Sequence, residues 1–219
     1  FGIYIVQGYG LTETSPVLAA EDEKHHKSGS IGIPMKHVTI EIVNPDDKGI
    51  GEMRAKGPNV MLGYYENEEL TNEVLKDGWF YTGDLAYRDK DGVIFITGRK
   101  KDMIVLRNGK KVFPEELELL IGRIKGIEES MVFGMPEEDD ENDVKVYAKV
   151  VYLPEVMKEA YGLEDEDAIH QKIWEEIKKI NQTLPPYKYM KGLITTKEPL
   201  IKTTTNKVKR QEEMKLILK

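Results

Sequence analysis

A change in residue usage near position 98 most constrains how this chain can fold. Thirteen of its 19 glycines lie in residues 1–98, which carry 9 basic and 16 acidic side chains, whereas residues 99–219 carry 23 of each. Glycine-rich sequence favours short strands joined by turns, and the glycine-poor remainder favours longer helices and strands. We therefore predict two parts, 1–98 and 99–219, joined by a hinge at the short charged segment 98–102.

The composition excludes several classes of protein. Of the 219 residues, 40% are hydrophobic, which is enough for a packed core. There is no cysteine, so a disulfide scaffold and thiolate metal sites are excluded. The absence of cysteine is consistent with a protein in a reducing compartment such as the cytoplasm. No apolar stretch approaches the roughly 20 residues that span a bilayer. The four histidines show no metal-ligand spacing. A net charge of −7 without a basic and aromatic stripe argues against nucleic-acid binding.

Alternation and turn signals place the secondary structure. Val38, Ile40 and Ile42 alternate with polar residues, which is the pattern of a half-buried strand. Pro114, followed by two glutamates, indicates the start of a helix. The predicted strands are 3–7, 38–43, 51–55, 93–97 and 144–153, and the predicted helices are 66–75, one from 114, 167–181 with an isoleucine stripe, and one after 207. The acidic run 137–143 is predicted to be a solvated turn between strands. These elements predict an α+β fold.

Residues 7–14, with the sequence QGYGLTET, form the first stretch that could carry chemistry. Gly10 and the glycine on the other side of Tyr9 would let the backbone approach a flat ligand, on which the Tyr9 ring could stack. Thr12 offers a hydroxyl to a phosphate oxygen, and Glu13 offers a carboxylate to Mg²⁺. A glycine-rich turn before a capped helix explains the same residues equally well. The stretch is not a Walker loop, because no Gly-Lys-Ser/Thr follows.

Three later stretches are also candidates. The run DGWFYTGD ends in Asp84, which is placed either to accept both hydroxyls of a ribose or simply to cap a turn. The charged runs GRKKD and NGKKVFPEE are typical of a solvated surface when each is taken alone. The run TTTNKVKR brings Lys207 close to the start of a helix. Its charge opposes the helix dipole there, which argues for a purpose beyond surface decoration.

In this order and spacing, the four stretches resemble the later motifs of the adenylate-forming enzymes. This superfamily contains acyl-CoA synthetases, nonribosomal-peptide adenylation domains and firefly luciferase, and the resemblance covers nearly the whole chain. The run DGWFYTGDLAYRDKDGVIFITGRKK is similar to the signature stretch of fatty-acyl-CoA synthetases, and LPPYKYM resembles the Leu-Pro-x-Tyr motif. The ending TTTNKVKR resembles the long-chain type, although Asn206 stands where many relatives have glycine.

The resemblance implies a reaction in two steps. A carboxylate attacks the α-phosphate of ATP to give acyl-AMP and pyrophosphate, and the thiol of coenzyme A then displaces AMP. The family's small domain rotates between the steps, which agrees with a hinge. Motif position implies a role for each candidate residue. For the nucleotide, Tyr9 beside Gly10 would stack on adenine, Thr12 would contact a phosphate, Glu13 would bind Mg²⁺, and Asp84 and Arg99 would bind the ribose. Lys101 would be the hinge, Gly109 would lie at the pantetheine tunnel, and Lys207 would stabilise charge in adenylation.

The resemblance also implies that the chain is part of a longer protein. The superfamily's phosphate loop, rich in Ser, Thr and Gly, and most of the acyl pocket would lie before residue 1, which is not a methionine. We therefore expect residues 1–98 to be the β-rich end of a large N-terminal domain, and residues 99–219 to be a complete small α+β C-terminal domain. The chain alone is expected to catalyse neither step. Residues 1–98 would expose the surface that the missing part of the large domain covers. These residues are expected to be poorly ordered, to be swapped with another copy of the chain, or to dimerise through that surface.

Three functions agree with these residues to different degrees. The first is a long-chain fatty-acyl-CoA ligase that uses a fatty acid, ATP, Mg²⁺ and coenzyme A in the cytoplasm, with peripheral membrane association left open. The second is another adenylate former, either an aryl-CoA ligase or an adenylation domain that loads a carrier protein. The third is a noncatalytic α+β binding module, which would leave the spacing of Asp84, Arg99 and Lys207 without a reason.

Overall fold

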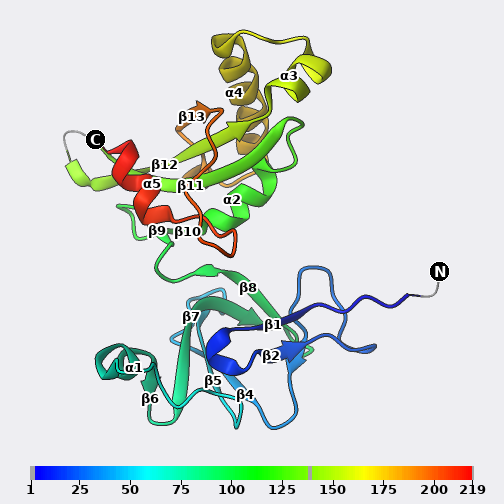
Figure 1. The fold of residues 1–219 in the computed structure, drawn as a ribbon, viewed down its shortest axis with the longest axis vertical. Coiled ribbons are helices and arrows are strands. Elements are labelled where there is room, and N and C mark those ends of the chain that lie inside the picture. The colour runs from blue at the N-terminus through cyan, green and yellow to red at the C-terminus, as the bar shows by residue number, and fades with distance from the viewer. Residues whose placement is uncertain (1–2, 138–139, 219) are drawn as a thin grey trace. The chain divides into compact units, whose positions relative to one another are not determined.

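The chain divides into two units within the charged segment 98–102. Unit 1 is residues 1–101 and unit 2 is residues 102–219. The computed structural model describes residues 3–137 and 140–218. Both units mix helices and strands, which confirms the α+β fold class (Figure 1).

Unit 1 consists of two antiparallel sheets. The first contains, in spatial order, β1 (Gly8–Gly10), β2 (Val17–Ala20) and β3 (Ile33–Pro34), with the short 3₁₀ helix η1 (Thr12–Thr14) between the first two strands. The second sheet contains, in spatial order, β4 (Thr39–Val43), β5 (Gly51–Lys56), β7 (Trp79–Arg88) and β6 (Leu75–Lys76), and β8 (Ile94–Arg99) also pairs with β7. Helix α1 (Glu68–Val74) immediately precedes β6.

The predictions for unit 1 are confirmed except at its start. Strands lie at the predicted positions 38–43, 51–55 and 93–97, and the helix lies within 66–75. The predicted strand 3–7 is wrong. Strand pairing begins at Gly8, opposite Ala20, and Ile3 and Ile5 are 76% and 78% exposed. An apolar alternation becomes a strand only where a neighbouring strand completes its hydrogen bonds, and within the described residues no strand pairs with 3–7, of which only Gln7 accepts a backbone hydrogen bond, from the Glu21 N–H.

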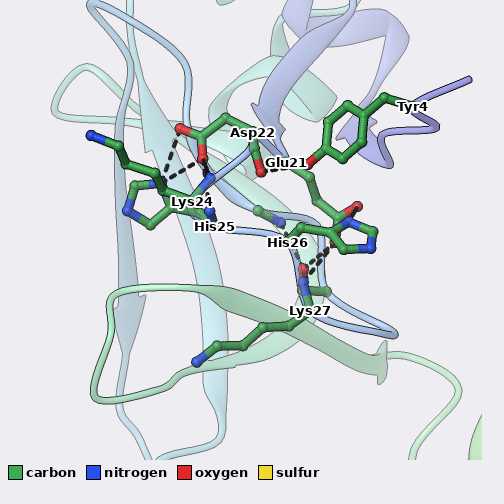
Figure 2. A network of polar contacts seen from close by, with 9 residues as sticks. Tyr4, Glu21, Asp22, Lys24, His25, His26 and Lys27 are labelled. Carbon is green, nitrogen blue, oxygen red and sulfur yellow. Dashed lines mark hydrogen bonds and ion pairs between the residues drawn. The ribbon is translucent and has the colours of Figure 1, made fainter. Parts of the chain in front are cut away.

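A buried carboxylate ties the loop after β2 to the chain that leads into β1. Glu21 accepts hydrogen bonds from Ser30 Oγ at 2.7 Å, from the backbone N–H of Gln7 at 3.0 Å and from that of Lys27 at 3.2 Å. Nδ1 of His26 lies 2.8 Å from the same carboxylate (Figure 2). These donors, led by Ser30, lower the pKa of Glu21 to about 2. Glu21 therefore stays charged and holds the loop at any ordinary pH.

Unit 1 is expected to lose stability as the pH falls from about 4.5, the ordinary pKa of Glu21, towards about 2. The unfolded chain takes up the proton first, so stability present above pH 4.5 disappears as the folded pKa is approached. Urea unfolding of the chain, followed by Trp79 fluorescence in a Trp174→Phe background, measures this. Glu21→Gln should flatten the pH dependence, whereas the exposed Glu23→Gln should not. Equal pH slopes for wild type and Glu21→Gln would contradict the assignment.

Unit 2 is a three-stranded sheet with helices on both faces. The sheet contains, in spatial order, β11 (Ile127–Glu137), β12 (Asp140–Tyr152) and β13 (Gly192–Thr196). β11 and β12 are antiparallel, and β13 runs parallel to β12 after a crossover through α3 (Pro154–Tyr161) and α4 (Glu166–Gln182). The remaining elements are the pair β9 (Ile104–Val105) and β10 (Lys111–Val112), helix α2 (Pro114–Ile121), the 3₁₀ helix η2 (Pro186–Lys188), and the final helix α5 (Arg210–Ile217).

The strand alternation decides which helix covers which face of this sheet. Val132 and Val150 belong to the buried cluster that includes residues of α2, α3 and α4. Met131 and Val151 belong to a second cluster, against which residues of α5 pack. The predicted strand 144–153 and the helices at 114, at 167–181 and after 207 are confirmed. The predicted acidic turn 137–143 is wrong for most of its length, because Glu137 belongs to β11 and residues 140–143 belong to β12; residues 138 and 139 lie outside the described residues. No helix in the described residues is both long and apolar enough to cross a membrane.

Candidate functional site

Three of the predicted site residues meet in unit 1. Asp84 in β7 and Arg99 in β8 are partners in the strand register, and Asp84 is only 6% exposed. Nε of Arg99 lies 2.8 Å from Oδ1 of Asp84 but is not aligned for a hydrogen bond, so this contact is an ion pair. The Tyr9 hydroxyl donates to Oδ2. Burial, and then the charge of Asp84, raises the pKa of Tyr9, so the phenol stays protonated and donates.

The local sequence explains why Asp84 points into this cluster. Gly83 adopts a φ of +71°, in the left-handed region that glycine favours. Thr82 Oγ1 accepts from the Asp84 backbone N–H at 3.1 Å, and the Lys100 N–H donates to the Gly83 carbonyl at 2.8 Å. A carboxylate has about four acceptor positions, and Tyr9 and Arg99 use two of them. Asp84 therefore keeps the capacity to accept two further hydroxyl donors.

Backbone packing explains Gly10. A Cβ atom at this position would lie 1.6 Å from the Pro16 carbonyl oxygen, whereas at Gly8 the nearest atom would be 3.5 Å away, an ordinary contact. Gly10 is thus required by the return of the chain beside β1, with or without a ligand. The Tyr9 ring is partly buried against the core of unit 1. Its stacking on adenine stays a prediction.

Thr12 and Glu13 lie on η1, next to this strand. Thr12 is exposed, and Glu13 is partly buried. The Tyr64 hydroxyl donates to Glu13 Oε1 at 2.8 Å, while no partner of Oε2 is found in the described part of the chain. No group of three carboxylate or imidazole side chains that could hold a metal exists among residues 3–137 and 140–218. A single carboxylate fits Mg²⁺ only where phosphates and water complete the coordination, as they do for nucleotide-bound Mg²⁺.

The other predicted residues lie at the end of unit 1 or in unit 2. Lys101 is exposed and ends unit 1. Gly109 is in the exposed turn between β9 and β10, at a φ of +76° that glycine favours. Lys207 is exposed in the loop before α5, which is closed by the Thr203 N–H donating to the Lys207 carbonyl at 2.8 Å. The structure thus brings together Tyr9, Asp84 and Arg99 within unit 1, whereas Gly109 and Lys207 belong to unit 2.

Unit 2 also has a pocket, of about 320 Å³, which the sequence did not reveal. Its lining includes three cationic residues, Arg107, Lys145 and Lys191, together with Tyr187 and Tyr189. The Lys145 ammonium also forms an ion pair, at 2.9 Å, with Asp143, which lines the same pocket. Cations and aromatic rings around one cavity suit a phosphorylated ligand with an aromatic base. Because these residues come from separate segments, only the tertiary structure collects them.

Sequence reasoning also missed the supports of the first stretch. Thr14 is fully buried, and its Oγ1 lies 3.0 Å from the Leu11 N–H and 2.8 Å from the Pro16 carbonyl. Thr14, the second threonine in QGYGLTET, was the available sequence signal for this turn. Tyr64 and Asn59 lie far along the chain from residue 14, and no local pattern links them to it.

Comparison with known proteins relates this geometry to a family. The AMP-binding enzyme family matches residues 1–65, and the AMP-binding enzyme C-terminal domain matches residues 101–216. The long-chain-fatty-acid–CoA ligase of Salmonella typhimurium is 40% identical over 153 residues, which are 67% of this chain and 27% of that protein. The feruloyl-CoA synthase of an Amycolatopsis species is 38% identical over 143 residues, which are 62% of this chain and 29% of that protein.

A solved structure agrees with the fold. The O-succinylbenzoate coenzyme A synthetase of Bacillus subtilis, in complex with ATP and a magnesium ion, has a TM-score of 0.77 and 25% sequence identity. The match covers 96% of this chain and 41% of that one. The chain thus spans well under half the length of these relatives, and the resemblance to adenylate-forming enzymes is confirmed. The chain belongs to the AMP-binding enzyme family of adenylate-forming acyl-CoA ligases, whose C-terminal domain matches residues 101–216.

Proposed function

We propose that the protein containing this chain is an AMP-forming long-chain fatty-acyl-CoA ligase. The observation that carries the nucleotide part is the buried Asp84 carboxylate, which Tyr9 and Arg99 hold and which has acceptor positions left for hydroxyl donors. Such a group suits the two hydroxyls of a ribose. The fatty-acid part is supported by the 40% identity with a long-chain-fatty-acid–CoA ligase.

Each remaining residue has a proposed task in the first step. Tyr9 stacks on adenine beside Gly10, Thr12 contacts a phosphate oxygen, and Glu13 binds the magnesium ion of the nucleotide. When bound, Mg²⁺ would supply positive charge next to the phosphates. Lys207 supports the same step, because attack on the α-phosphate builds negative charge that a positioned ammonium stabilises.

The second step needs a path for coenzyme A and a change of domain position. Gly109 lines the proposed pantetheine path, and Lys101 is the proposed hinge residue. The pocket beside Lys145 and Tyr187 is proposed to take the phosphorylated nucleotide end of coenzyme A, since it offers cations and aromatic rings together. Residues 1–98 are proposed to be the end of the large domain, and residues 99–219 the mobile small domain.

Assays on the full-length protein test this proposal. Palmitate is expected to release pyrophosphate from ATP and to consume the free thiol of coenzyme A, whereas the 219-residue chain alone is expected to do neither. Absence of palmitate-dependent pyrophosphate release from the full-length protein would overturn the fatty-acid assignment.

A second candidate is an aryl-CoA ligase, which the 38% identity with feruloyl-CoA synthase favours. Ferulate in place of palmitate separates the two candidates in the same assay. If acyl-AMP forms but coenzyme A is not consumed, the acceptor is a carrier protein. If neither acid releases pyrophosphate, a noncatalytic role gains support.

A further inference from the structure

The chain at residues 59–64, between β5 and α1, supports the turn that carries Glu13. The Asn59 side-chain amide donates to the Thr14 carbonyl at 2.8 Å and to the Val17 carbonyl at 2.9 Å. The Met61 N–H donates to the Glu13 carbonyl at 2.8 Å. Three hydrogen bonds from one segment therefore fix the backbone at Glu13 and in the residues that follow it.

Tyr64, at the end of this segment, fixes the side chain of Glu13 as well. Its hydroxyl donates to Glu13 Oε1 at 2.8 Å. Its own backbone N–H donates at 2.9 Å to Oγ1 of Thr71, which in turn donates at 2.7 Å to the Asn67 carbonyl at the start of α1. The donor is thus anchored independently of the carboxylate that it holds.

We propose that Tyr64 is a positioning residue that holds Oε1 of Glu13 and leaves Oε2 directed to the metal ion of the bound nucleotide. The inference rests on the proposed function, in which Glu13 binds that ion. Without the hydroxyl, the carboxylate is free to rotate, and ordering it again costs free energy when the metal binds. Outer groups that orient a ligand typically change metal affinity by roughly 10–100-fold when they are removed.

Neighbouring tyrosines provide a matched pair of variants. Tyr64→Phe removes only the hydroxyl that contacts Glu13. Tyr65→Phe removes the same group from a side chain that is 90% exposed. Glu13→Gln in the same full-length enzyme serves as the reference for complete loss of the carboxylate charge, because it replaces the carboxylate with a neutral amide.

Calorimetric titration of the full-length enzyme with α,β-methylene-ATP, with and without Mg²⁺, measures the effect without turnover. Tyr64→Phe is expected to reduce the Mg²⁺-dependent gain in affinity by roughly ten-fold and to leave the metal-free affinity unchanged. Tyr65→Phe should match wild type, and Glu13→Gln should lose most of the gain.

The three variants distinguish a failure of the positioning role of Tyr64 from a failure of the proposed function. If Tyr64→Phe keeps the full Mg²⁺ dependence while Glu13→Gln loses it, the proposed function stands and the positioning role is overturned. If Tyr64→Phe weakens binding equally with and without Mg²⁺, Tyr64 has a general structural role and the inference is also overturned. If Glu13→Gln keeps the full Mg²⁺ dependence, the assignment of Glu13 to the metal falls, and with it the inference.

Discussion

Lys207→Ala in the full-length enzyme is expected to slow acyl-adenylate formation by roughly 10²–10³-fold, the usual cost of removing one group that stabilises charge in a transition state. Transfer of the acyl group from preformed acyl-AMP to coenzyme A should stay near the wild-type rate, because the small domain that contains Lys207 is proposed to rotate between the two steps. Lys207 is exposed, with no ion-pair partner in the described part of the chain, and its loop is closed through Thr203. The substitution therefore removes a charge and leaves the loop intact.

Two half-reactions measured separately check this expectation. Pyrophosphate exchange reports adenylation, and loss of free thiol with added acyl-AMP reports transfer. Lys209→Ala is the matched control, since Lys209 is an exposed neighbour whose ammonium pairs with Glu212 at 3.0 Å on the surface. Adenylation at close to the wild-type rate in Lys207→Ala would remove the role assigned to this lysine.

The largest expected effect on stability lies in the helix that follows this loop. Glu213 in α5 is 1% exposed, and its Oε2 lies 2.7 Å from the Lys149 ammonium on β12. Its Oε1 accepts from the Ile201 N–H at 2.6 Å, and the Ile201 carbonyl accepts from the Lys209 N–H at 2.7 Å. Glu213 therefore holds α5 on the sheet and fixes both ends of the Lys207 loop.

Glu213→Ala is expected to lower the free energy of unfolding of unit 2 by about 3–5 kcal/mol, because Lys149 is left largely buried and unpaired. The double variant Lys149→Met/Glu213→Leu should recover most of this loss, since apolar side chains of similar size replace the pair without a stranded charge.

Urea unfolding of the 219-residue chain, followed by Trp174 fluorescence in a Trp79→Phe background, reports on unit 2 alone. The exposed Glu212→Ala should change the free energy of unfolding by no more than about 0.5 kcal/mol. A loss below about 1 kcal/mol for Glu213→Ala would show that the pair is not a main anchor of α5.

Local patterns predicted the elements that carry their own periodicity. The stripe formed by Ile169, Ile173 and Ile177 predicted α4, and all three side chains are buried. Pro114 stands at the first turn of α2, as its missing N–H favours. The apolar segment 3–7 shows the limit of this reasoning, because a strand depends on a partner that alternation doesn't specify. The short strands β9, β10 and β13 were missed, since two to five residues carry too little pattern, and the long strands β7 and β11 were missed as well.

The amino-acid sequence by itself determined the family, the order of its motifs and the identity of Asp84, Arg99 and Glu13 as candidates, because these depend on residue types at fixed spacings. Only the tertiary structure decided what holds those residues. Tyr9 meets Asp84 across 75 residues, Tyr64 meets Glu13 across 51, and Lys149 meets Glu213 across 64. Hydrogen bonds and ion pairs act over about 3 Å in space and have no dependence on separation along the chain, so no local pattern can encode them.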